Sequence, residues 1–148
     1  MKKMTRRPFS REMLLPLPVR QVNALALEYH LALSVLALGR GGLDQVARLA
    51  QALCHARRLA GAGSEEAGAL SLAEAVLDAI ATRAEADEAW SVMPAEHATI
   101  ARALAICDRL LAREPYHCFA TVWTAMLHGV SQMACMESGS NRHNEATP

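Results

Sequence analysis

Aromatic residues are scarce in this chain of 148 residues, which holds only two Phe, two Tyr and two Trp. A β-sandwich or barrel would need more aromatic and β-branched side chains along its strands. Ala and Leu, both strong helix formers, are abundant instead. The composition therefore predicts an all-α fold, a compact antiparallel bundle of about five helices.

Long apolar runs are also missing. The segment closest in character to a membrane span, residues 24–38, is interrupted by Glu28, His30 and Ser34, whereas a spanning helix needs about 20 mostly apolar residues. The basic N-terminus does not resemble a secretory signal, because Pro16 and Pro18 interrupt its apolar part. We expect a cytoplasmic protein with no membrane partner.

Signatures of catalysis and of cofactor binding are absent as well. The sequence has no Gly-rich phosphate loop after a strand, no nucleophile elbow and no metalloprotease motif. One Glu-x-x-His pair, Glu114 with His117, is too little for a di-iron site, which needs two such pairs. Cys118 follows His117, but adjacent helical side chains point about 100° apart, so a nucleophile–base pair is not expected. We predict no enzyme activity and no cofactor or metal. The four cysteines lack CxxC spacing and suit small buried positions.

Charge is distributed unevenly along the chain. The first twenty residues carry a net charge of about +5, and the remainder carries about −5. Proline at positions 8, 16 and 18 disfavours helix there, so residues 1–17 are predicted to form an extended basic arm. Such an arm can bind DNA or another polyanion, or pack on the acidic body of the chain. Its candidate contact residues are Lys2, Lys3, Arg6, Arg7 and Arg11.

Hydrophobic periodicity predicts a helical domain over residues 18–137, followed by a disordered tail over 138–148. Helices are expected at 19–38, 43–60, 71–90 and 94–112, and Pro115 should open a fifth. The helix at 71 is placed by a capping-box pattern, Ser71 with Glu74. The helix at 19–38 has two opposite apolar arcs, which predicts a central element covered on both sides.

The fifth helix is expected to carry an apolar arc rich in aromatic and methionine side chains. Five short helices leave little material to cover this arc and both arcs of residues 19–38. We therefore expect a protein interface, in a homodimer or with another protein, to complete the core. The candidate interface residues are Phe119, Trp123, Met126 and Met133.

Residues 6–60 resemble a group of small proteins from proteobacterial plasmids and integrated elements that often carry the label "Fis-family regulator". The resemblance rests on residues 14–18 (LLPLP), residues 25–33 (LALEYHLAL) and the 39–42 turn that leads into residues 43–46 (LDQV). It implies a bacterial, cytoplasmic accessory protein of a mobile genetic element, and it assigns no functional residue.

Two functions follow from these patterns. The first is a non-enzymatic helical interaction module that binds, regulates or inhibits a macromolecular partner, a class that includes anti-defence proteins. The alternative is a DNA-binding accessory transcriptional regulator that uses the basic arm. The two differ in whether DNA affinity depends on the arm and on salt.

Overall fold

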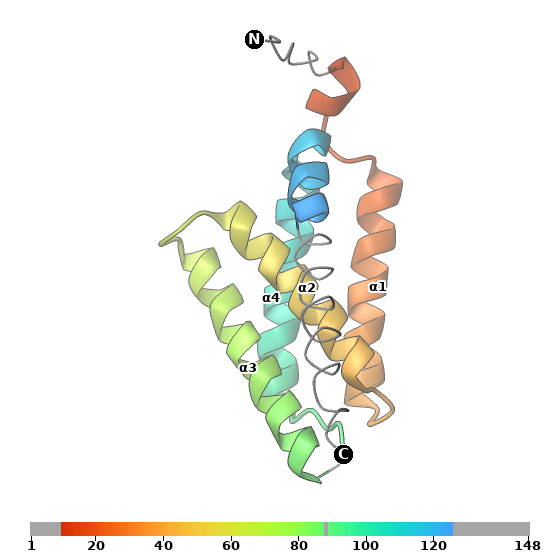
Figure 1. The fold of residues 1–148 in the computed structure, drawn as a ribbon, viewed down its shortest axis with the longest axis vertical. Coiled ribbons are helices and arrows are strands. Elements are labelled where there is room, and N and C mark those ends of the chain that lie inside the picture. The colour runs from red at the N-terminus through yellow and green to blue at the C-terminus, as the bar shows by residue number, and fades with distance from the viewer. Residues whose placement is uncertain (1–9, 88, 126–148) are drawn as a thin grey trace, which may run out of the picture.

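The computed structural model describes residues 10–87 and 89–125, and within them the chain is helical (Figure 1). The body consists of α1 (Val19–Ala37), α2 (Leu43–Ala60), α3 (Glu65–Asp87) and α4 (Pro94–Arg113). A short 3-10 helix, η1 (Arg11–Leu14), precedes them, and residues 116–125 form a further helical segment. No strand occurs in these described ranges. The predicted all-α bundle is confirmed.

Local signals account for where α2 and α4 begin. The Gly42 N–H donates to Gln45 Oε1 at 2.8 Å, and the Met93 N–H donates to Glu96 Oε2 at 2.9 Å. Both contacts satisfy a backbone donor that the start of a helix leaves unpaired. Pro94 suits the first position of α4, because its missing N–H has no partner to lose there. Sequence and structure agree within one residue at the ends of α1, α2 and α4.

The predicted start of the third helix at Ser71 is wrong, since α3 begins at Glu65. Ser64 is the residue that caps it. The Ser64 hydroxyl accepts a hydrogen bond from the Ala67 N–H at 3.0 Å and donates to the Gly61 carbonyl at 3.2 Å. Ser71 and Glu74 therefore lie inside a helix whose first turn is already capped.

Both α2 and α4 pack against all three of the other α-helices of the body. In Figure 1, α1 and α3 lie on opposite sides of the body, and α2 crosses between them. The prediction that α1 is covered on both sides is wrong. In the described part of the chain, the buried residues of α1 lie on one face, and they are Val22, Tyr29, Ala32, Leu33 and Leu36.

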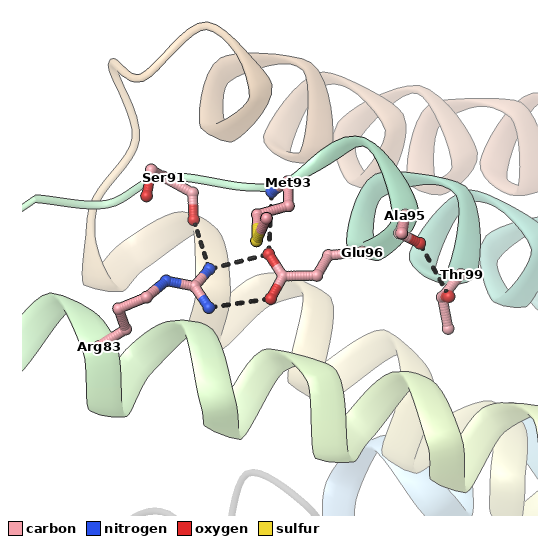
Figure 2. Close-up of polar contacts among 6 residues, drawn as sticks. All are labelled: Arg83, Ser91, Met93, Ala95, Glu96 and Thr99. Atoms are coloured by element: carbon pink, nitrogen blue, oxygen red, sulfur yellow. Dashed lines mark hydrogen bonds and ion pairs between the residues drawn. The ribbon is translucent and has the colours of Figure 1, made fainter.

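A polar clamp joins α3 to the start of α4 (Figure 2). The guanidinium of Arg83 donates to both carboxylate oxygens of Glu96, at 2.9 Å and 2.8 Å, and to the Ser91 carbonyl at 3.0 Å. The core of the body is mostly aliphatic. Its largest fully buried side chains are Leu36, Leu49, Leu53, Leu70, Leu77, Ile80, Ile100, Leu104 and Cys107.

The segment that precedes α1 pairs with the segment that follows α4. The Tyr116 N–H donates to the Leu15 carbonyl at 2.9 Å, and the Leu17 N–H donates to the Glu114 carbonyl at 3.1 Å. These bonds form an isolated antiparallel bridge between residues 16 and 115, which we name the clasp. Residues 11–14 form η1 rather than extended chain. The remainder of the predicted arm, residues 1–9, and the predicted tail lie outside the described residues.

Candidate functional site

The outer face of α1 is an apolar surface that the described chain leaves uncovered. Its residues follow one another in alternating steps of four and three, so they lie in one stripe along the helix. Every one of them is exposed, including Leu27 at 61%, Leu31 at 54% and Leu38 at 73%. We use "outer face of α1" for these six residues: Arg20, Ala24, Leu27, Leu31, Ser34 and Leu38.

Ion pairs within the chain border the outer face on both edges. On one edge, Glu28 pairs with Arg48 of α2. On the other, His30 Nε2 lies 2.9 Å from an Asp108 carboxylate oxygen of α4. Both carboxylates beside the stripe thus have a partner within the chain, and the middle of the stripe carries no charge. The stripe has leucine at three positions and the small residues Ala24 and Ser34 on either side of Leu27 and Leu31, which gives a face that another helix can approach closely.

The basic arm is described only in part. Arg11 is the first residue of η1 and is exposed. The other predicted contact residues, Lys2, Lys3, Arg6 and Arg7, lie outside the described residues. Of the five predicted polyanion contacts, the described residues thus include Arg11 alone.

The aromatic residues predicted as an interface pack within the chain. Phe119 is 6% exposed, and Trp123 is a partly buried neighbour of the core. Their rings stack on each other at 5.6 Å between centroids, and Phe119 lies 5.1 Å from the ring of His55 on α2. Helix 116–125 thus covers α2. Met126 and Met133 lie outside the described residues.

His55 is the one buried polar or charged side chain in the described part of the chain, at 3% exposure. Neither of its ring nitrogens has a hydrogen-bond partner. Burial, together with the smaller effect of the Arg58 charge, lowers the pKa of His55 from 6.5 to about 4. The ring is therefore neutral at pH 7 and behaves as part of the aromatic contact. The sequence pattern does not reveal this burial, because His55 shares its side of the helix with the polar residues Gln51 and Arg58.

The ground on which no nucleophile–base pair was expected at His117 and Cys118, that their side chains point apart, is wrong, because the side chains do meet. Cys118 Sγ lies 3.2 Å from His117 Nε2, and His117 Nδ1 lies 2.8 Å from the Met13 carbonyl oxygen. The Met13 carbonyl accepts a hydrogen bond from His117 Nδ1–H, and this leaves Nε2 to accept one from the thiol. However, burial raises the pKa of the Cys118 thiol, and the nearby Glu114 carboxylate raises it further. A protonated thiol is a weak nucleophile, so this pair is not arranged for attack on a substrate.

In the described residues, no group of three or more His, Cys, Asp or Glu side chains is placed to hold a metal ion. The helices over the same ranges include none with the length and apolar character needed to cross a membrane. Searches of protein-family models, of curated proteins and of solved structures find no match to this chain. The outer face of α1 is therefore the candidate site, on its geometry alone.

Proposed function

We propose that this chain is a non-enzymatic helical interaction module that binds a macromolecular partner through the outer face of α1. The observation that carries the proposal is a row of three leucines, each more than half exposed, on a helix whose opposite face is buried in the core. An apolar stripe of this kind is typical of a surface that another protein covers.

The free energy available from this surface is modest. Completing the burial of Leu27, Leu31 and Leu38 would contribute roughly 3–5 kcal/mol, from their exposed fractions and the usual value for a buried leucine. Association itself has an entropic cost of similar or larger size. A stable complex therefore needs contacts along the whole helix, including the small residues and the paired charges at its edges.

For the biological setting, we propose a cytoplasmic accessory protein of a bacterial mobile element that regulates or inhibits its partner, a class that includes anti-defence proteins. The support is the resemblance of residues 6–60 to small proteins of such elements.

Substitution on the outer face tests the proposal. In Leu31→Lys, a charge replaces an apolar side chain that is 54% exposed, so the fold should be retained and the association lost. Leu72→Lys on α3 is the matched control, because Leu72 is 60% exposed on another helix. The readout is cross-linking of the protein in its native extract, together with its mass in solution. If Leu31→Lys, like the control Leu72→Lys, keeps every association of the unmodified chain, the proposal fails.

The alternative function, a DNA-binding accessory regulator, is favoured by the charge step at the N-terminus. It predicts binding to duplex DNA that weakens with salt and disappears when residues 1–13 are deleted, each lost phosphate contact lowering the salt slope by about 0.9. Negligible DNA affinity at low salt, with the arm present, would exclude it.

A further inference from the structure

We propose that the outer face of α1 binds the same face of a second copy of this chain, with the two α1 helices antiparallel. This inference rests on the proposed function and names the partner of that surface. It depends on three properties of the described residues: the spacing of the stripe, the position of its single charge and the pairing of the charges at its edges.

The spacing is that of a helix–helix seam. Alternating steps of four and three residues place Arg20, Ala24, Leu27, Leu31, Ser34 and Leu38 at the positions that meet a second helix in a left-handed pair. The partner must present a matching exposed seam. The outer face of α1 is itself such a seam, so a second copy supplies what the first requires.

The position of Arg20 selects the antiparallel arrangement. In a parallel pair, the two Arg20 side chains would face each other and repel. When the helices are antiparallel and centred between Leu27 and Leu31, Arg20 faces Leu38 of the second copy, at the C-terminal end of its α1. A cation is favourable there, because the last carbonyls of a helix carry partial negative charge.

The same register matches the other positions. Leu27 of each copy faces Leu31 of the other, which gives two central leucine layers. Ala24 faces Ser34, and these small residues let the two backbones approach closely.

The edges of the face are also compatible with a two-fold axis. In an antiparallel pair, each edge meets the same edge of the other copy. The Glu28–Arg48 pair thus meets its own equivalent, and so does the His30–Asp108 pair. The guanidinium of each Arg48 then lies near two Glu28 carboxylates, and both Asp108 carboxylates keep their contacts with the His30 rings.

A charge-pair experiment tests both the partner and the direction. Leu27→Glu and Leu31→Lys should each make the protein monomeric, weakening self-association by about a hundredfold or more. An equimolar mixture of the two variants should form a heterodimer. Only in antiparallel helices does the carboxylate introduced at position 27 of one copy face the ammonium group introduced at position 31 of the other. The readout is mass by light scattering after size-exclusion chromatography, with circular dichroism to confirm the fold and Leu72→Lys as the control that stays dimeric.

The outcomes separate this inference from the proposed function. If the unmodified chain is monomeric at the highest attainable concentration, the second copy is not the partner, and cross-linking in extract then decides whether the outer face binds another protein. If either single variant remains dimeric, the two copies do not pair through α1. If both variants are monomeric and their equimolar mixture also stays monomeric, the antiparallel register is wrong.

Discussion

Protonation of His55 should destabilise the fold, and the size of the effect can be worked out from the structure. The ring lies between α2 and the aromatic pair Phe119 and Trp123, and no hydrogen-bond partner is available for a charged form. Burial lowers its pKa from 6.5 to about 4. At about 1.4 kcal/mol per unit of pKa, full protonation costs about 3 kcal/mol of folding free energy.

The sign of the pH dependence follows from which state binds the proton first. Above pH 6.5 the ring is neutral in the folded and the unfolded chain, so the whole contribution is present. As the pH falls from 6.5 toward 4, the unfolded chain binds the proton and the folded chain does not, so stability is lost. About 2 kcal/mol of this loss should occur between pH 7 and pH 5.

The assay is urea unfolding at pH 7 and pH 5, monitored by circular dichroism, for the unmodified chain and for His55→Phe. The Phe variant keeps a ring against Phe119 and Trp123 but cannot titrate, and His55→Gln serves as a second non-titrating variant if Phe packs badly. Glu96 and Glu114 titrate in every variant, so the difference between proteins isolates His55. If the unmodified chain and both variants lose equal stability between the two pH values, the reasoning about His55 is refuted.

Two further predictions concern the links between helices, both read from urea unfolding. Glu96→Gln should lower the stability at pH 7 by about 1 kcal/mol, because it removes the charge from the bonds to Arg83. The bond from Arg83 lowers the pKa of Glu96 below 4.5. The variant should therefore lose less stability than the unmodified chain as the pH falls below that value, and equal losses would contradict the clamp. Gly41→Ala should cost about 1–3 kcal/mol, since the new Cβ would lie 3.0 Å from Cα of fully buried Leu36. Gly68→Ala, in the open interior of α3, should instead stabilise by up to about 1 kcal/mol, and equal effects at the two sites would rule out the contact with Leu36.

The helix boundaries show how far local chemistry determines the fold. The bounds of α2 could be predicted because an amphipathic stretch lies between glycines, at Gly42 and Gly61. The start of α3 could not, because Ser64 and Ser71 both resemble caps. The choice between them depends on whether the first turn after Ser64 packs against the body, which no local pattern reveals.

Tertiary contacts explain the other differences. Hydrophobic periodicity correctly shows that α1 is apolar on two sides. It does not show whether other helices of the chain pack against both of these sides. The burial of His55 depends on helix 116–125 returning over α2, some sixty residues later in the sequence. The contact between His117 and Cys118 depends on side-chain rotamers, which the angle between neighbouring helical positions does not fix.

The clasp has a consequence for how the chain can be cut and extended. Residues 15–17 continue directly into α1, and residues 114–116 follow directly from α4, and these two helices pack against each other. Once α1 and α4 are in contact, the clasp joins segments that are already neighbours, so closing it orders few additional residues. The segment before α1 and the start of helix 116–125 are consequently held at the same end of the body. A truncated chain that begins after residue 17 would lose the hydrogen bonds at both of these segments together, although the deleted residues belong to only one of them.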